Sequence, residues 1–407
     1  MGRMFYMPWK EHGVIEERFR FVEEYNSNDW DMAELCRFYE VSRATGYKWV
    51  ERYEAGGLVA LQDRSRAPQS HPNAVSSEME DLVIAERGQH PYWGAPMIRA
   101  RLLRNHSQKM VPAESTIGAI LKRHGLTVSR KRKRPERAPA QPLAHAGQPN
   151  DVWSADFKGW FRSADGRRID PLTLADAYSR FLLRCQALQA ADTLHVKPVC
   201  EAAFREYGLP DRMRIDNGPP FGSNGESGLT QLTVWWIQLG IVPEHIAPGQ
   251  PQQNGRHERM HRTLKQATAS PPARDRRAQQ QRFDQFREEY NHQRPHEALG
   301  QQTPATHYRG SPRAYPERLR EVEYASDWEV RRVSAGGQMR WRGDYVFVAH
   351  ALEGQPVGLE PRPEGGWRVW FSFHEVGHLD PGEQRVRRPP VKPPETVGDP
   401  GAGDDLR

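Results

Sequence analysis

The chain has 407 residues, which is too long for one hydrophobic core, so two to four domains are expected. Its mean hydropathy is −0.84, yet 12 Trp, 13 Tyr and 14 Phe supply apolar side chains for packed domains, which excludes a wholly disordered chain. The net charge is +6 and the basic residues are clustered, which favours a polyanionic partner.

Cysteine usage and hydropathy exclude further classes. Cys36, Cys185 and Cys200 are scattered without a Cys-x-x-Cys pair, so neither a zinc ribbon nor a disulfide framework is indicated. No apolar run approaches the roughly 20 residues that span a bilayer, and the N-terminus lacks a signal-peptide pattern. A cytoplasmic protein without a membrane partner is therefore expected.

Residues 14–61 predict a small helical unit with the form helix, short turn, helix over residues 32–53. Ser42 is a natural N-cap for the second of these helices. Arg43, Thr45 and Lys48 would then lie on its outward face, where a recognition helix contacts DNA. An ordinary helical hairpin is the alternative, and the basic setting favours DNA. The apolar spacing that supports the unit comes from Leu35, Phe38, Val41, Tyr47 and Val50.

A second helical unit is predicted at residues 76–126, after a linker at 62–68 that carries Arg64 and Arg66. Ser115 is a candidate helix cap and Gly125 a helix stop. Two such units in tandem would reach along a longer DNA site than one. The basic run after them and the Pro/Ala/Gln-rich stretch to Pro149 predict a hinge, either solvated or in contact with DNA; the run is Arg130, Lys131, Arg132, Lys133 and Arg134.

From residue 151 the pattern changes to that of an α/β sheet. Trp153, Ala155 and Phe157 alternate with Ser154, Asp156 and Lys158, which places the two sets on opposite faces of a strand. The predicted order is β-β-β-α-β-α-β-α, with strands at 152–161, 168–177 and 181–188, a helix at 193–207, a strand at 212–216, a helix at 229–239, a strand at 241–246 and a final helix after 254.

The final helix follows a Pro/Gly/Gln segment at 248–253, and Asn254 is its candidate N-cap. Helical spacing puts Met260, Leu264 and Ala267 on the inward side. On the opposite side it puts Glu258, His261, Arg262 and Lys265. The simplest interpretation of Glu258 alone is an i,i+4 pair with Arg262 on a solvated helix, worth a few tenths of a kcal/mol.

Two upstream aspartates change that interpretation. Asp156 lies in the first predicted strand and Asp216 at the end of the fourth, so these two carboxylates and Glu258 can meet at one edge of the sheet. A lone aspartate at a strand end is usually a turn former, whereas three acids at these places favour a divalent-metal site.

Three motifs resemble those of the DDE transposase and retroviral-integrase superfamily, and most of all bacterial insertion-sequence transposases. The first two are Trp153-Ser-Ala-Asp156-Phe and Ile215-Asp216-Asn-Gly; the third is Pro251-Gln-Gln-Asn-Gly-Arg-His-Glu258-Arg. Tyr290-Asn-His-Gln-Arg-Pro-His296 and Thr303-Pro-Ala are similar to the end of that core, and Tyr92-Trp-Gly and His124-Gly-Leu fit the preceding units. The resemblance covers roughly residues 14–310.

The resemblance implies a ribonuclease H-like fold in which Asp156, Asp216 and Glu258 are catalytic and hold two Mg²⁺ (or Mn²⁺) ions, supported by Asn217 and Asn254. It implies that water cleaves at the element's ends and that the freed 3′-hydroxyl attacks target DNA, without a covalent intermediate or ATP. It also implies double-stranded DNA, both element ends and target, as partner, a homo-oligomer on DNA, and association with the nucleoid during action. Further candidate DNA contacts are Arg256, Arg262 and Lys265.

The chain departs from the family pattern in a long segment between Asp216 and Glu258, interpreted as a surface insertion around residues 222–228. Asp176, in Ala175-Asp-Ala-Tyr-Ser-Arg, is a rival acid. It matches a position that the family uses structurally, so it is left out of the metal site.

Residues 327–379 alternate again, with Gly turns, and predict a small β-barrel. Arg340, Arg342 and Arg368 alternate with its aromatic residues, which suits either DNA backbone contact or a solvated face. The predicted domains are helix–turn–helix units at 1–66 and 67–129, a basic linker at 130–150, the α/β core at 151–310, a connector at 311–326, the barrel at 327–382 and a disordered tail at 383–407.

Two other functions compete with transposition. A former transposase could survive as a catalytically idle DNA-binding regulator, which the intact acids, Asn217 and Asn254 disfavour. A structure-selective nuclease on the same fold is disfavoured by the tandem helix–turn–helix units. A strand-transfer assay on the element's own ends separates the three functions.

Overall fold

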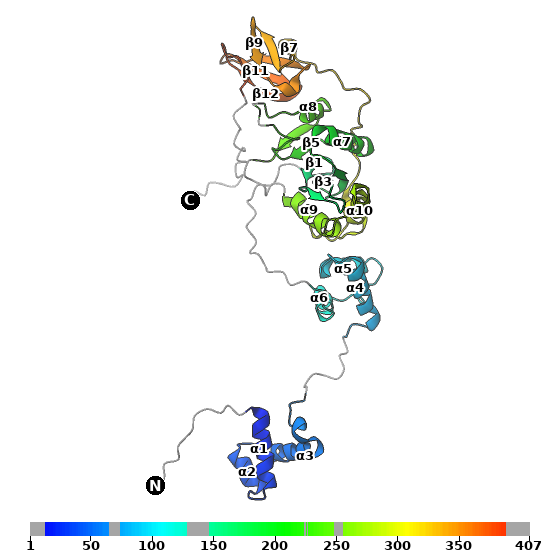
Figure 1. Cartoon of the computed structure of the whole chain (residues 1–407), viewed down its shortest axis with the longest axis vertical. Helices are drawn as coiled ribbons and strands as arrows, with labels where there is room; N and C mark the ends of the chain where they lie inside the picture. Colours follow the sequence, from blue (N-terminus) through cyan, green and yellow to red (C-terminus); the bar gives the residue numbers. More distant parts are fainter. Residues whose placement is uncertain are drawn as a thin grey trace, which may run out of the picture. The chain divides into compact units, whose positions relative to one another are not determined.

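The computed structural model describes residues 13–64, 74–127, 146–223, 225, 227–247 and 255–387. Asn254, Arg66 and the basic run at 130–134 lie outside these residues. The chain divides into two compact units, Met1–Ala74 and Val75–Arg407 (Figure 1). Each unit is considered by itself. Among the described helices, none combines the length and the apolar character needed to cross a membrane.

The first unit is a three-helix bundle of α1 (Val14–Asn26), α2 (Met32–Phe38) and α3 (Arg43–Ala60). Ser42 caps α3 as predicted, because its side chain accepts a hydrogen bond from the Thr45 amide at 3.2 Å. Gly46 lets α2 and α3 approach closely, since a Cβ there would lie 2.7 Å from Cys36 Sγ.

Two residues of the predicted apolar set in this unit are misplaced. Phe38 is 65% exposed and Tyr47 is 54% exposed, whereas Leu35 and Val50 are buried and Val41 is half-buried. The core closes without them because α1 supplies Phe21 and Val22, which are buried in the same cluster.

The second unit begins with α4 (Ser77–Gln89), α5 (Ala95–Leu102) and α6 (Glu114–Arg123), which bury one apolar cluster. The predicted cap at Ser115 is wrong, since α6 begins at Glu114 with Ala113 as N-cap and no side-chain cap. Gly125 is confirmed as a stop, because it adopts the left-handed φ of +68° that glycine tolerates.

The central sheet contains β1 (Val152–Phe157), β2 (Phe161–Arg162), β3 (Arg168–Asp176), β4 (Leu182–Leu188), β5 (Arg212–Ile215) and β6 (Val242–His245). Its order is β2-β3-β1-β5-β6, with β4 pairing β3. β1 pairs antiparallel with β3 and parallel with β5, and β5 pairs parallel with β6. The predicted strand at 152–161 is two strands, β1 and β2, with residues 158–160 between them.

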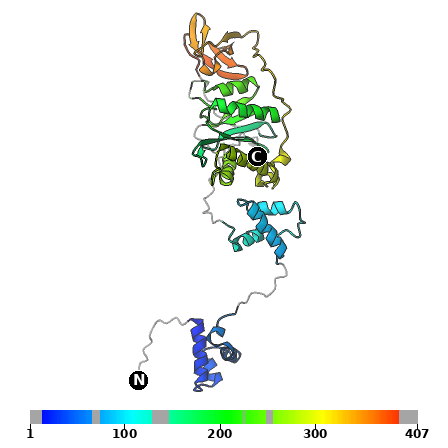
Figure 2. The ribbon, with the colours of Figure 1, turned by 45° about the vertical axis from the view of Figure 1, so that its right-hand side comes forward.

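Helices cover both faces of this sheet (Figures 1 and 2). α7 (Thr193–Tyr207) and α8 (Gln231–Gln238) pack on the face that carries Trp153 and Ala155. α9 (Gly255–Thr268) and α10 (Arg276–Glu288) pack on the other face through Met260, Leu264, Phe283 and Phe286. The α/β core is therefore confirmed, including the predicted alternation along β1.

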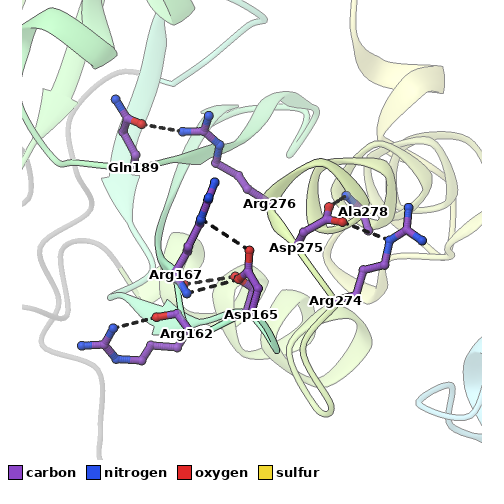
Figure 3. Close-up of polar contacts among 10 residues, drawn as sticks. Arg162, Asp165, Arg167, Gln189, Arg274, Asp275, Arg276 and Ala278 are labelled. Carbon is purple, nitrogen blue, oxygen red and sulfur yellow. Dashed lines mark hydrogen bonds and ion pairs between the residues drawn. The ribbon is translucent and has the colours of Figure 1, made fainter.

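Backbone hydrogen bonds tie the α9–α10 connection to the β2–β3 turn, and Figure 3 draws polar side chains of both segments. The Ala164 and Asp165 amides donate to the carbonyl oxygens of Ala273 and Arg274 at 2.9 and 3.0 Å. Asp275 caps α10 by accepting from the Ala278 amide at 2.8 Å. These bonds fix the far end of α9, and so help to set how the helix lies on the sheet.

The end of α10 explains a motif of the resemblance. There the chain turns through a π-helix (Glu289–Gln293), a 3₁₀ turn (Glu297–Leu299) and α11 (Pro304–His307). Asn291 is buried; its Oδ1 accepts from the Leu182 amide at 2.8 Å and its Nδ2 donates to the Leu182 carbonyl oxygen at 3.0 Å. The side chain thus satisfies backbone groups at the start of β4 as a neighbouring strand would.

The C-terminal strands do not close into the predicted barrel. β7 (Glu329–Arg332), β10 (Pro356–Pro361), β11 (Trp367–Phe371) and β12 (His374–Leu379) form one open sheet in the order β12-β11-β10-β7. β8 (Gln338–Trp341) and β9 (Asp344–Phe347) form a separate hairpin, and a 3₁₀ turn (His350–Leu352) follows it. The apolar cluster of these strands includes Val234 and Ile237 of α8, so a helix supplies part of the cover that barrel closure would provide.

The predicted tail begins too early. Bridges pair Arg385 with Phe347 and Arg387 with His378, and Val386 is buried between them. Residues 383–387 therefore belong to this C-terminal unit, and the remainder of the predicted tail lies outside the described residues.

Candidate functional site: carboxylates at one end of the central sheet

Two of the predicted acids lie at the ends of neighbouring parallel strands. The register pairs Val152 with Arg212 and Ser154 with Arg214, so Asp156 near the end of β1 and Asp216 just after β5 lie at the same edge of the sheet. Glu258 lies in the first turn of α9, which packs on the sheet face opposite α7 and α8.

The pKa of the Asp156 carboxyl group is affected by the charges of the other two acids, which therefore lie near it. Its side chain is 18% exposed. Burial, followed by the charges of Asp216 and Glu258, raises the pKa of Asp156 to about 7, against the opposing effects of the Phe157 amide and Lys158. The carboxylates therefore repel one another across this edge. A divalent cation would relieve that repulsion, and the oxygen donors suit Mg²⁺ or Mn²⁺.

Asp216 is half-buried, and burial raises the pKa of its carboxyl group even though the Gly218 amide and His245 act in the opposite direction. Asn217 is exposed, and its Nδ2 donates to the Ile246 carbonyl oxygen at 2.8 Å. That bond links the ends of β5 and β6, so the structure gives Asn217 a role in the backbone below the acids.

The two faces of α9 differ in part from the prediction. Met260 and Leu264 are buried, and Glu258, Arg262 and Lys265 are exposed, as predicted. His261, predicted on the outer face, is buried at 5% exposure, and Ala267, predicted inward, is exposed. The inward stripe instead contains His257 and His261, one residue before and three residues after Glu258.

These two histidines share one hydroxyl group of the sheet. Thr173 Oγ1 donates to the carbonyl oxygen of Asp156 at 3.1 Å, and lies 2.6 Å from His257 Nε2 and 2.7 Å from His261 Nε2. His257 Nδ1 lies 2.8 Å from Ser154 Oγ. Burial lowers the pKa of His257 to about 3; burial, with His257 and Lys158, lowers that of His261 to about 2.

His261 also approaches the first acid, because its Nδ1 lies 3.8 Å from Asp156 Oδ2. Asp156, His257 and His261 form a group in which one ligand atom from each residue lies within 4.8 Å of the others. Within the described residues the three predicted acids do not meet that limit together. Sequence reasoning missed this pair, although a spacing of four residues places two side chains on one helical face.

Asp176 has a structural environment, consistent with its exclusion from the metal site. Its carboxylate accepts hydrogen bonds from the Asn150 amide at 2.8 Å and from the Ser179 amide and hydroxyl at 2.7 and 2.6 Å. It therefore holds the turn that follows β3.

The predicted DNA-contacting residues are mostly at the surface. In the first unit Arg43, Lys48 and Arg64 are exposed, whereas Thr45 is half-buried and its hydroxyl lies 2.8 Å from that of Ser42. In the second unit Arg256, Arg262 and Lys265 are exposed.

Models of known families match most parts of the chain. Two Integrase core domain models match residues 146–251 and 239–304. A Helix-turn-helix domain model matches residues 17–69, and a Homeodomain-like domain model matches 45–121. A model of the C-terminal domain of IS481 family transposases matches residues 328–387.

Curated relatives include proteins of insertion elements. The chain is 31% identical over 198 residues to an uncharacterized 31.7 kDa protein of insertion element IS407 from Burkholderia multivorans, covering 44% of this chain and 64% of that one. It is 32% identical over 185 residues to an uncharacterized 39.2 kDa protein of IS476 from Xanthomonas euvesicatoria, covering 43% and 49%. The chain thus spans about half to two thirds of the length of these relatives.

Among solved structures, the magnesium complex of the HTLV-2 integrase catalytic core aligns with 15% identity and a TM-score of 0.32, covering 41% of this chain and 100% of that one. A simian T-cell lymphotropic virus intasome aligns with 14% identity and a TM-score of 0.35, covering 74% of this chain and 99% of that one.

The family models and the insertion-element relatives agree on one class: residues 146–304 match Integrase core domains, and the chain is similar to proteins of insertion elements. Residues 328–387 match the C-terminal domain of IS481 family transposases, so the similarity is, in particular, to transposases of insertion sequences.

Proposed function

We propose that the protein is a DNA transposase that cuts the ends of its insertion sequence and joins their 3′-hydroxyl groups to target DNA by two-metal phosphoryl transfer. The observation that carries the proposal is the convergence of charge on Asp156, whose carboxyl pKa is raised to about 7 by burial and by two further acids, within an integrase core. Such a strongly perturbed group in a family core is typical of a functional site.

In this proposal Asp156, Asp216 and Glu258 hold two divalent ions, Mg²⁺ or Mn²⁺. When bound, such ions neutralise charge on the phosphate oxygens and activate the attacking oxygen. The donor set fits, because three carboxylates supply hard oxygen ligands. The structural test of fit is the mutual repulsion around Asp156, which a cation would relieve.

The remaining residues of this end position the acids. Thr173 Oγ1 holds the backbone carbonyl of Asp156 and is itself held by His257 and His261. Both imidazoles stay neutral near pH 7 because burial lowers their pKa values to about 3 and 2. Asn217 supports the end of the segment that carries Asp216, and Asn254 is assigned the supporting role that the resemblance implies.

The partner in this proposal is double-stranded DNA, as element ends and as target, bound by an oligomer of the protein at the nucleoid. The helix–turn–helix units recognise the ends, with Arg43, Thr45 and Lys48 on the recognition helix and Arg64, Arg66 and residues 130–134 along the linkers. Arg256, Arg262 and Lys265 contact DNA near the acids. The family models over residues 17–121 support this division of labour.

The test is a strand-transfer assay of the purified protein with Mg²⁺ on duplexes carrying the inverted repeats that flank its gene. Joined products that depend on Mg²⁺ are expected, and binding without cleavage by the wild type would favour the idle regulator instead. Cleavage of branched DNA regardless of sequence would favour the structure-selective nuclease.

A further inference from the structure

A small pocket lies beside the acids, on the same face of the sheet. It is lined by side chains that include Arg180, Arg214 and Arg256. Ser154, two residues before Asp156 on β1, forms part of its wall, and so does His257, which precedes Glu258. Two residues along a strand span about 7 Å, so the pocket and the acids are close neighbours.

Three guanidinium groups meet here against their own repulsion. Arg180 Nη1 and Arg256 Nη1 both donate to one acceptor, the carbonyl oxygen of Ala177, at 2.9 and 3.2 Å. Burial, followed by the charge of Arg256, lowers the pKa of Arg180 to about 10.

Two carboxylates face the three arginines, and one of them, Asp176, is part of the pocket wall. Glu244 pairs with Arg214, which is 3% exposed, at 2.7 Å. Asp176 accepts three hydrogen bonds from Asn150 and Ser179. Within the parts of the chain that the structure describes, neither Arg180 nor Arg256 forms an ion pair with a carboxylate. The pocket therefore carries an excess of positive charge.

Size and surroundings define the ligand that would suit this charge. The pocket has a volume of about 30 Å³, which admits an oxygen-bearing group rather than a nucleobase. Arginine forks match phosphate oxygens. The pocket also lies at the first turn of α9, a helix of 14 residues, where the helix dipole favours an anion.

We infer that Arg180, Arg214 and Arg256 form a phosphate-binding pocket that holds a backbone phosphate of the DNA strand next to the reacting phosphate. This assignment rests on the proposed function for the source of the phosphate. A DNA backbone phosphate and free inorganic phosphate both present the anionic oxygens that such a pocket would bind. A strand held here would be fixed on one side of the acids before chemistry begins.

The first test uses the full chain in EDTA, so that no step of cleavage enters. Thermal unfolding is followed with inorganic phosphate against sodium chloride at matched ionic strength. For the wild type we expect the Tm to rise by about 3 °C at saturating phosphate. The Arg180→Gln/Arg256→Gln variant should lose this gain, and its Tm without phosphate should equal or exceed that of the wild type because repulsion is removed.

The matched control is Arg167→Gln/Arg274→Gln, which removes two exposed arginines at the β2–β3 turn and the α9–α10 connection (Figure 3). It should retain the phosphate-dependent gain. Arg180→Lys/Arg256→Lys keeps the charge and should restore part of the gain. A lower Tm in the glutamine variant, together with no phosphate response in the lysine variant, would show a structural role and overturn the inference. An undiminished gain in the glutamine variant would also overturn it.

The second test separates the two sources of phosphate. In EDTA, the Kd for a 30-base-pair duplex is measured across a salt series. Loss of phosphate contacts should reduce the slope of log Kd against log salt by about 1 to 2 in the glutamine variant, and by more than in the control. An unchanged slope beside a lost phosphate gain would assign the pocket to a free anion and refute the DNA source. Neither result depends on cleavage, so a failure of the transposase proposal is recorded separately.

Discussion

Two groups of like charge lie on one face of the central sheet: the acids around Asp156 and the arginines around Arg180. They are about two residues apart along β1 and along α9. Burial and the charges of Asp216 and Glu258 raise the pKa of Asp156, whereas burial and the charge of Arg256 lower the pKa of Arg180. At the β2–β3 turn, by contrast, Arg167 lies 3.7 Å from Asp165 in an exposed pair. The two groups thus differ from the exposed pair because like charges lie together in them, an arrangement that a bound ligand of the opposite charge would stabilise.

Asp156→Asn removes one charge from the acidic group, and Asp216→Asn does the same at the neighbouring strand end. The amide keeps the shape of the side chain and loses the charge, so cleavage and joining should fall by at least about a thousandfold. End binding should remain. The measurement is Mg²⁺-dependent cleavage beside a binding assay, and retained cleavage in either variant would refute the assignment.

The same variants carry a stability signature. Because Asp156 is repelled by Asp216 and Glu258, Asp156→Asn should unfold at an equal or higher temperature than the wild type in EDTA near pH 8. A marked drop in Tm would show that the carboxylate is structural, which would weaken the comparison between the two charged groups.

A comparison of Glu258→Gln with Arg262→Ala tests whether Glu258 belongs to the metal-binding acids or to the cationic outer face of α9. If Glu258 only pairs with Arg262 at the surface, Glu258→Gln should lower the free energy of unfolding by a few tenths of a kcal/mol and leave activity near normal. If it holds a metal ion, cleavage should drop by orders of magnitude, with partial rescue by Mn²⁺. Arg262→Ala, and Lys265→Ala likewise, should weaken DNA binding and leave metal binding intact. Near-normal cleavage by Glu258→Gln would return this residue to the surface pair.

Cationic residues of the first unit are expected to recognise DNA sequence, whereas the arginine pocket would bind a phosphate, which carries no sequence information. A fragment ending near Pro139 should bind the element's ends specifically. Arg43→Ala should weaken that binding about tenfold and relax base preference if Arg43 contacts a base edge. Binding is measured on the ends and on an unrelated duplex of equal length. Equal affinity for both duplexes would contradict the specificity.

Much of this architecture could be predicted because local pattern and fold agree. The alternation along β1 and the helix at Thr193–Tyr207 follow directly from residue spacing. The three acids could be proposed because strand ends and a family motif coincide. The site assignments stay predictions.

Other features depend on contacts that spacing does not encode. Helical geometry places His261 near the edge of the polar face, and only the position of Thr173 on the neighbouring strand makes burial favourable for both histidines. The barrel prediction failed because α8, far upstream in the chain, covers part of the C-terminal strands. The arginine pocket was missed because Arg180, Arg214 and Arg256 come from three separate elements.

The last and smallest effect concerns the histidines between the two charged groups: His257 lines the arginine pocket and His261 faces Asp156. Burial lowers the pKa of His261 to about 2, so its neutral form stabilises the fold fully above the unfolded pKa of about 6.5. This contribution is lost as the pH falls below that value, because the unfolded chain then binds a proton that the folded chain does not.

Asp156 titrates with the opposite sign, since its folded pKa of about 7 lies above the unfolded value and acid favours the folded state. Variants must therefore be compared rather than the wild type alone. In EDTA, the wild type should lose about 2 kcal/mol relative to His261→Asn between pH 6.5 and pH 5. The advantage of Asp156→Asn over the wild type should instead shrink as the pH falls from 7 to 5. Urea unfolding at pH 8, 6.5 and 5 measures both differences, and a stability difference for His261→Asn that stays constant across this range would show that His261 titrates alike in both states.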